Sequence, residues 1–193
     1  MTATETQMSG TALPLEIERK FLIRTPDTAS LQKMPGCRVL QMEQVYLLSA
    51  PGETHRTRRV EENGRHIFYE TVKRPVTGVT RVEIEKQIPE EEYLRLLEKA
   101  DPARHPICKT RYCLPFGGRT FEIDVYPFWH DRAILEVELV SEKEAIRFPP
   151  GIEILREVTE EAEYRNSALA LKIPEEEPVQ AGIQAAGATD GHE

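Results

Sequence analysis

The stretch Pro14-Leu15-Glu16-Ile17-Glu18-Arg19-Lys20-Phe21-Leu22-Ile23 decides the expected fold, because its apolar and charged residues alternate. Alternation sends successive side chains of a strand to opposite faces of a sheet. Glu16, Glu18 and Lys20 therefore share one face, opposite Leu15, Ile17, Phe21 and Ile23. A divalent metal suits the two carboxylates and an anion suits the lysine. Taken alone, the stretch favours an ordinary half-buried strand with a solvated outer face, and the rest of the chain reverses this preference.

Composition predicts one globular domain with loose ends. The chain has 193 residues, of which 39% are hydrophobic and 30% are charged, as in folded proteins that bury a sizeable core. Residues 1–13 and 175–193 are small, polar or acidic, so we expect disordered tails around a domain at 14–174. The tails hold six acids and neither Lys nor Arg, so the net charge of −8 falls to about −2 for the domain. This charge does not indicate a nucleic-acid surface.

The cellular setting is predicted from what the sequence contains and lacks. No apolar run is long enough to cross a bilayer, and the N-terminus lacks a signal-peptide pattern. The three cysteines, Cys37, Cys108 and Cys113, have no metal-ligand spacing, so reduced thiols in the cytoplasm are expected. We expect no membrane and no nucleic-acid partner, and a homodimer is left open.

Eight strands follow one another, mostly through hairpin turns such as Asn63-Gly64 and Gly117-Gly118. Besides the first stretch, they are expected at about 39–48, 53–61, 65–74, 80–88, 107–114, 119–126 and 132–140. Helices are expected near 25–34 and 89–100 and, at the C-terminus, from Thr159 to about Lys172. The predicted fold class is therefore mainly β, with flanking helices and a C-terminal helix.

Charged residues of both signs lie in strict phase opposite the apolar face of nearly every strand. The acids are Glu16, Glu18, Glu83, Glu85, Glu122, Asp124, Glu136 and Glu138; the bases are Lys20, Arg56, Arg58, Lys73, Arg81, Lys109 and Arg111. Paired carboxylates suit Mg²⁺ or Mn²⁺, which take oxygen ligands, and rows of arginines suit phosphate. A single charged pair is more often a solvated face, and cross-strand ion pairs also stabilise an open sheet. Because the whole set is in phase, we expect a closed eight-stranded antiparallel barrel with a charged interior, a tunnel, and an apolar outside against helices.

The chain resembles the CYTH domain, the triphosphate tunnel metalloenzymes, in its short bacterial form. Glu16-Ile17-Glu18-Arg19-Lys20 is similar to the family's Glu-x-Glu-x-Lys signature. The resemblance covers residues 14–173 and continues through Gln44-Val45-Tyr46-Leu47, Arg56-Thr57-Arg58, Lys73, Arg81-Val82-Glu83-Ile84-Glu85, Lys109-Thr110-Arg111-Tyr112, Glu122-Ile123-Asp124, Glu136-Val137-Glu138, Glu157-Val158-Thr159 and Tyr164-Arg165-Asn166-Ser167-Ala168-Leu169. One departure is Phe68-Tyr69-Glu70-Thr71-Val72-Lys73-Arg74-Pro75, where relatives often have a Leu-Thr-x-Lys run and then a glycine.

The resemblance implies roles for the charged residues. A first metal would be held by Glu16, Glu18, Glu136 and Glu138, and a second metal or its waters by Glu83, Glu85, Glu122 and Asp124. Phosphate would be bound by Lys20, Arg56, Arg58, Lys73, Arg81, Lys109 and Arg111. Lys73, Glu83 and Glu85 are the expected catalytic residues, without one assigned general base. Tyr164 and Arg165 would close one end of the tunnel, or Tyr164 would simply pack the last helix.

Three functions are compatible with this set. The first is Mg²⁺- or Mn²⁺-dependent hydrolysis of a triphosphate, with inorganic tripolyphosphate or a nucleoside triphosphate as the small-molecule partner. The second is an adenylate cyclase of the CYTH type, which would need a nucleoside pocket that no residue pattern indicates. The third is a polyphosphate- or nucleotide-binding module without turnover, which would have no use for so many carboxylates. The sequence therefore favours the triphosphatase.

Overall fold

The computed structural model describes residues 17–77, 80–141 and 144–175, and these ranges contain nine strands. The elements in chain order are β1 (Ile17–Arg24), α1 (Thr28–Gln32), β2 (Arg38–Leu47), β3 (Thr54–Glu62), β4 (Arg65–Thr77), β5 (Thr80–Ile88), α2 (Glu90–Leu97), β6 (Ile107–Phe116), β7 (Arg119–Val125), β8 (Arg132–Leu139), β9 (Ile154–Glu157), a 3₁₀ turn η1 (Ala162–Tyr164) and α3 (Asn166–Leu169). Glu16 and the predicted tails lie outside the described residues, except for Glu175 at the edge of the second tail. None of the helices in the described ranges has the length and apolar character that crossing a membrane requires.

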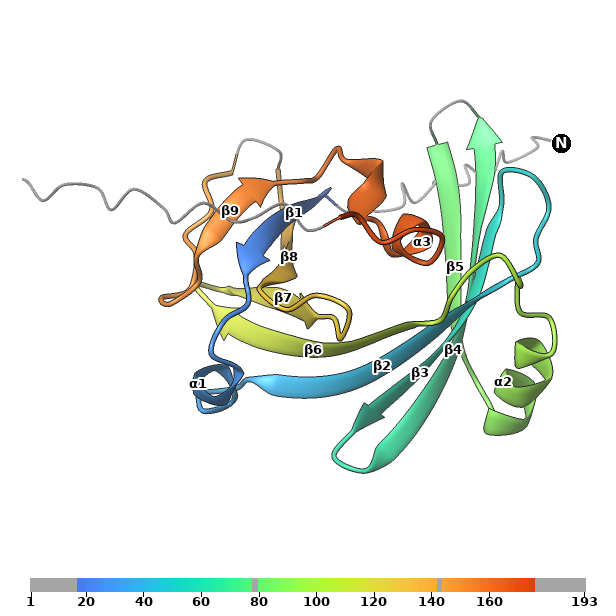
Figure 1. Cartoon of the computed structure of the whole chain (residues 1–193), viewed down its shortest axis with the longest axis horizontal. Helices are drawn as coiled ribbons and strands as arrows, with labels where there is room; N and C mark the ends of the chain where they lie inside the picture. The colour runs from blue at the N-terminus through green and yellow to red at the C-terminus, as the bar shows by residue number, and fades with distance from the viewer. Residues whose placement is uncertain (1–16, 78–79, 142–143, 176–193) are drawn as a thin grey trace, which may run out of the picture.

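The strands form one curved antiparallel sheet in the order β5-β4-β3-β2-β6-β7-β8-β1-β9. The predicted hairpin at Asn63-Gly64 is confirmed: both residues have positive φ, 52° and 77°, the conformation that a tight two-residue hairpin turn requires. In Figure 1 the sheet bends so that β1 and β8 at one end and β4 and β5 at the other rise around a common concave side.

The expected closed eight-stranded barrel is wrong, because the sheet stays open between its two ends. Closure of eight strands would require β5 to pair with the edge of β1 that faces away from β8. That edge is already taken by β9, the strand that the sequence did not predict: Ile154–Glu157 runs antiparallel to β1, with Phe21 opposite Glu157 and Leu22 opposite Arg156. The second backbone edge of β1 is therefore occupied at Phe21, Leu22 and Ile23, and β5 remains an edge strand.

The apolar outer face is confirmed and is covered at two places. At the β1–β6–β7–β8 end, Phe21, Leu114, Phe121 and Leu135 belong to a buried cluster that also contains Leu31 of α1. At the other end, a second cluster places Val45, Phe68 and Ile88 of the sheet against Tyr93 and Leu96 of α2. The alternation in the sequence therefore predicted which side chains form the core.

The tunnel prediction required a concave face that is charged along its whole length. In the structure, part of this face is apolar. A third buried cluster on that side contains Leu22, Tyr46, Ile107, Tyr126 and Ile134 of the sheet and its loops. Residues of the C-terminal segment, residues 162–171, complete this cluster. The long C-terminal helix is replaced by η1 and the short α3, which lie over the concave side between the two ends of the sheet (Figure 1). The C-terminal segment thus covers part of the opening that strand pairing does not close.

The outer core makes a direct test of the fold. Phe121 has no exposed surface and its ring lies 6.2 Å from that of Phe148 and 6.4 Å from that of Phe116. We expect Phe121→Ala to lower the free energy of unfolding by about 3–5 kcal/mol in urea titrations, because a buried aromatic ring leaves a cavity. Leu48, which is 64% exposed, is the control, and Leu48→Ala should change stability by less than about 0.5 kcal/mol. Equal effects of the two substitutions would contradict the assignment of the core.

Candidate active site

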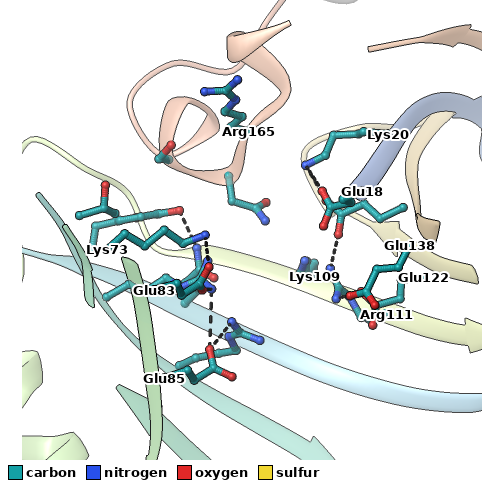
Figure 2. A pocket seen from close by; sticks show the side chains of 18 of the residues that line it. Glu18, Lys20, Lys73, Glu83, Glu85, Lys109, Arg111, Glu122, Glu138 and Arg165 are labelled. Carbon is teal, nitrogen blue, oxygen red and sulfur yellow. Dashed lines mark hydrogen bonds and ion pairs between the residues drawn. The ribbon is translucent and has the colours of Figure 1, made fainter. Parts of the chain in front are cut away.

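The concave face holds a cavity of about 840 Å³. Strands from both ends of the sheet and the C-terminal segment contribute its lining. Twelve of the predicted site residues line it: Glu18, Lys20, Arg56, Arg58, Lys73, Glu83, Glu85, Lys109, Arg111, Glu122, Glu136 and Glu138. Figure 2 shows the labelled strand residues as two groups that face each other across the cavity, with Lys73, Glu83 and Glu85 on one side. Period-two alternation along the strands therefore brought distant residues to one place.

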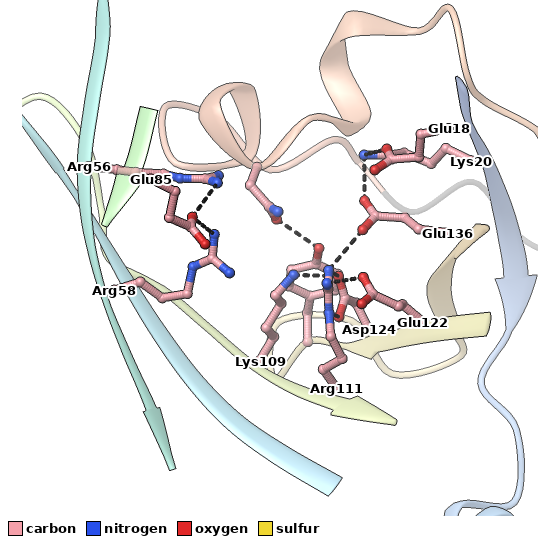
Figure 3. Close-up of polar contacts among 12 residues, drawn as sticks. Glu18, Lys20, Arg56, Arg58, Glu85, Lys109, Arg111, Glu122, Asp124 and Glu136 are labelled. Atoms are coloured by element: carbon pink, nitrogen blue, oxygen red, sulfur yellow. Dashed lines mark hydrogen bonds and ion pairs between the residues drawn. The ribbon is translucent and has the colours of Figure 1, made fainter. Parts of the chain in front are cut away.

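The first group lies on β3, β4 and β5, and we call it the arginine half: Arg56, Arg58, Lys73, Glu83 and Glu85. Lys73 and Glu83 are directly opposite each other on β4 and β5, and Lys73 Nζ lies 2.6 Å from a Glu83 carboxylate oxygen. Arg58 and Arg56 contact Glu85 at 3.1 and 3.8 Å. Figure 3 shows the two guanidinium groups converging on that carboxylate. The side chains of Glu83 and Glu85 are still 42% and 37% exposed, and these two carboxylates face three cations, so this half has one positive charge in excess.

The second group lies on β1, β6, β7 and β8, and we call it the carboxylate half: Glu18, Lys20, Lys109, Arg111, Glu122, Asp124, Glu136 and Glu138. Arg111 holds three of its carboxylates, with contacts of 2.7 Å to Asp124 and 2.8 Å to Glu136 and a further ion pair to Glu122. Lys20 Nζ continues the series at 2.6 Å from Glu136. Figure 3 shows this chain of ion pairs from β6 to β1.

Asp124 lies beneath the cavity rather than in its lining. Its side chain has no exposed surface and pairs with both Lys109 and Arg111. Burial alone would raise the pKa of Asp124, but Lys109 and then Arg111 outweigh burial and hold the pKa well below its ordinary value. Burial and Asp124 would likewise raise the pKa of Glu136, and Lys109, Lys20 and Arg111 outweigh them and lower it. Both carboxylates are therefore ionised and serve as counter-ions to buried cations.

Glu18 differs from these two acids. Partial burial and the nearby Glu136 raise its pKa, because Lys20 at 3.7 Å compensates only in part. On the facing strands Glu18 is directly opposite Glu138, and Glu122 is directly opposite Glu136. Like charges directly opposite each other destabilise a sheet unless a cation lies between them. Glu18, Glu122, Glu136 and Glu138 thus form an acidic patch in the carboxylate half that a cation would stabilise.

The donor chemistry of this patch fits Mg²⁺ or Mn²⁺, but its arrangement does not complete a metal centre. Glu18, Glu122, Glu136 and Glu138 supply the carboxylate oxygens that these hard cations prefer. Within the described ranges, however, no three His, Cys, Asp or Glu residues converge as ligands of a metal ion. Lys20 and Arg111 already form ion pairs with Glu136, and Arg111 also pairs with Glu122. Carboxylate oxygens of Glu136 and Glu122 that could bind a metal are therefore in use. A metal would therefore bind in competition with these ion pairs.

Two predicted site residues are not placed by the structure, and several lining residues were not predicted. Glu16 lies outside the described residues, and so does the side chain of Arg81, whose backbone belongs to β5. Reasoning from charge missed the neutral part of the lining: Gln44, Tyr46, Thr54, Thr159, Asn166 and Ser167. The phase of Gln44 and Tyr46 on their strand was a usable signal. Arg165 also lines the cavity, whereas Tyr164 is buried against Trp129 and so packs the segment.

An open antiparallel sheet that gathers lysines, arginines and carboxylates around one cavity is typical of a binding site for a charged ligand. No family model matches the chain. Two curated relatives are inorganic triphosphatases. The one from Nitrosomonas europaea is 36% identical over 82% of this chain and 99% of its own, and the one from Acetivibrio thermocellus is 32% identical over 80% of this chain and 92% of its own.

A solved structure agrees with these relatives. The crystal structure of an inorganic triphosphatase superposes with a TM-score of 0.55 and 30% identity, covering 84% of this chain and 99% of the other. The chain therefore belongs to the inorganic triphosphatase family.

The two kinds of carboxylate give opposite predictions for the ligand-free protein. Asp124→Asn should lower the free energy of unfolding by about 3–5 kcal/mol, because it leaves Lys109 and Arg111 buried without a full counter-ion. Glu18→Gln removes a carboxylate whose pKa is raised by burial and by repulsion from Glu136, so it should leave stability unchanged or higher. Urea titrations at pH 7 measure both values. Equal destabilisation by the two substitutions would contradict the distinction between a buried counter-ion and a repelled carboxylate.

The same measurement has a defined pH dependence. The folded-state pKa of Asp124 is depressed, so its contribution is complete above the unfolded value of about 3.9 and is lost as pH falls through the folded value. The acid limb of the stability curve should therefore be shallower for Asp124→Asn than for the wild type, and identical slopes would count against the ion pair.

Proposed function

We propose that this chain is a CYTH-type enzyme that hydrolyses inorganic triphosphate with Mg²⁺ or Mn²⁺. The observation that carries the proposal lies in the arginine half. The Nε atoms of Arg56 and Arg58 are buried at the cavity and have no hydrogen-bond partner among the described residues. A buried donor without a partner costs about 1–3 kcal/mol, and phosphate oxygens are the natural acceptors of guanidinium groups. Burial and the neighbouring Arg56 also lower the pKa of Arg58, as expected for cations crowded together at an anion site.

The cations would divide the phosphate chain between them. Arg56, Arg58 and Lys73 reach it from the arginine half, and Lys20 and Arg111 reach it from the opposite side. In the absence of substrate, the ion pairs with carboxylates would hold each of these cations in an extended conformation over the cavity, where the phosphate chain would bind them. Lys109 is 6% exposed and paired with Asp124. It would therefore add to the positive electrostatic potential beside Arg111 more than it would contact the substrate directly.

The carboxylates Glu18, Glu136 and Glu138, together with Glu16, would hold the divalent cation, with Glu122 beside them. Such a cation, when bound, neutralises phosphate oxygens and lowers the pKa of water. The remaining catalytic work falls on the protein, because phosphoryl transfer depends mainly on positioning and charge stabilisation. Lys73 would stabilise charge on the transferred phosphoryl group. One of the two carboxylates beside it, Glu83 or Glu85, both partly exposed, would accept the proton of the attacking water.

Hydrolysis is tested with inorganic tripolyphosphate as substrate and Mg²⁺ or Mn²⁺ as activator. We expect phosphate release that EDTA abolishes and that added metal restores. ATP serves as the comparison substrate, with cyclic AMP measured as a second product. Phosphate release that is insensitive to EDTA would contradict the metal mechanism, and cyclic AMP as the main product would replace hydrolysis by cyclisation.

The arginine half offers a matched pair of neighbouring arginines. Arg58 lines the cavity, whereas Arg59 lies on the opposite face of β3, where it pairs with Glu43. Arg58→Ala should raise the KM for tripolyphosphate by about tenfold or more, since a hydrogen bond to a charged group contributes about 1.5–3 kcal/mol. Arg59→Ala removes the same charge and should leave the KM within about twofold. If both variants change the KM alike, the effect comes from net charge, and Arg58 does not contact the substrate.

A further inference from the structure

The C-terminal segment Ala162–Leu171 is a fixed wall of the cavity. Tyr164 and Leu169 are buried against the concave face in the cluster that contains Trp129 and Tyr126. The backbone is also tied down, because the amide of His105 donates to the carbonyl of Ala170 at 2.7 Å. The polar side chains that this segment presents to the cavity therefore have a defined place, opposite the sheet.

Arg165 stands out among the cations of the cavity. Six others, Lys20, Arg56, Arg58, Lys73, Lys109 and Arg111, pair with at least one carboxylate. Arg165 is exposed, lines the same cavity and has no ion pair with any residue in the described ranges. Its five N–H donors are free for a ligand, so no internal ion pair must be broken when an anion binds. Figure 2 places it on the C-terminal segment between the two halves of the site.

Asn166 is oriented by a buried tyrosine. The Tyr126 hydroxyl donates a hydrogen bond of 2.8 Å to Asn166 Oδ1, and Tyr126 itself is 1% exposed. Its ring is held by Phe128 and Trp129 at centroid distances of 5.0 and 5.3 Å. With Oδ1 used by Tyr126, the side chain of Asn166 has its two N–H donors left for the cavity that it lines.

We propose that Arg165 and Asn166 bind the phosphate chain of the substrate from the side opposite the sheet, with Tyr126 as the positioning residue for Asn166. The identity of the ligand as an inorganic triphosphate rests on the function proposed above. The C-terminal segment thereby supplies the wall that the open sheet lacks: strands bind the anion from two sides, and Arg165 and Asn166 bind it from a third. A guanidinium group and an amide are both donors to phosphate oxygens, and neither needs a metal to act.

The test measures the dissociation constant of tripolyphosphate by calorimetry in EDTA, together with the KM in Mg²⁺. Arg165→Ala should weaken binding by about tenfold, and Arg165→Lys should recover part of the loss because it keeps the charge without the fork. Arg95 of α2, which is exposed and outside the cavity lining, is the control, and Arg95→Ala should bind like the wild type. Wild-type affinity of Arg165→Ala would overturn the role of Arg165. Binding without hydrolysis by the wild type in Mg²⁺ would instead refute the proposed function, and absence of binding both in EDTA and in Mg²⁺ would refute both.

A double-mutant cycle tests Tyr126 separately from the stability of the fold. Asn166→Ala and Tyr126→Phe should each weaken tripolyphosphate binding several-fold, and the double variant should bind no more weakly than Asn166→Ala alone. Thermal melting of each variant reports any loss of packing, which is independent of this coupling. Additive losses would show that Tyr126 does not act through Asn166, and unchanged affinity of Asn166→Ala would remove that residue from the site.

Discussion

The structure depends on one constraint: the Lys109 and Arg111 side chains lie on the concave face, only 4% and 12% exposed, and must be neutralised there. Arg111 on β6 pairs with Asp124 and Glu122 on β7 and with Glu136 on β8, and Glu136 pairs with Lys20 on β1. Removing Asp124 would leave Lys109 and Arg111 without the buried counter-ion that they share, which costs more than an ion pair gains. This chain of ion pairs therefore fixes four strands in one register and fixes the floor of the site at the same time.

The arginine half has buried hydrogen-bond donors without partners among the described residues, unlike the carboxylate half. The carboxylate half therefore stabilises the fold, and the arginine half is left available for a ligand. Arg56 and Arg58 have buried Nε donors without partners among the described residues, and their acidic neighbours remain partly exposed. They lie on β3, which pairs with β2 on one side and with the β4–β5 hairpin at the edge of the sheet on the other. A substrate that supplies acceptors to these arginines would complete the network that the protein leaves open, which is how a preorganised site gains affinity without rearranging its core.

Much of this site was predictable because a strand has a period of two. Alternation assigned twelve cavity residues, and Asn63-Gly64 fixed a hairpin, from local sequence alone. Alternation gives the face of a side chain and not its depth, so Asp124 could not be distinguished from the exposed Glu138. Closure was mispredicted because β9 is only four residues long and follows Pro149-Pro150-Gly151, yet it occupies the edge that closure would need. Asn166 belongs to a motif of the family resemblance but was given no role, because it follows no strand pattern and its orientation depends on the contact with Tyr126.

In the proposed complex the phosphate chain lies between the arginine half and the carboxylate half, with the divalent cation on the latter. A crystal structure of the complex with tripolyphosphate and Mn²⁺ tests it most directly, because anomalous scattering locates the manganese independently of the phosphorus positions. The account predicts phosphate oxygens at Arg56, Arg58 and Arg111 and manganese beside Glu18, Glu136 and Glu138. Phosphate bound outside the cavity, or manganese away from these carboxylates, would contradict it.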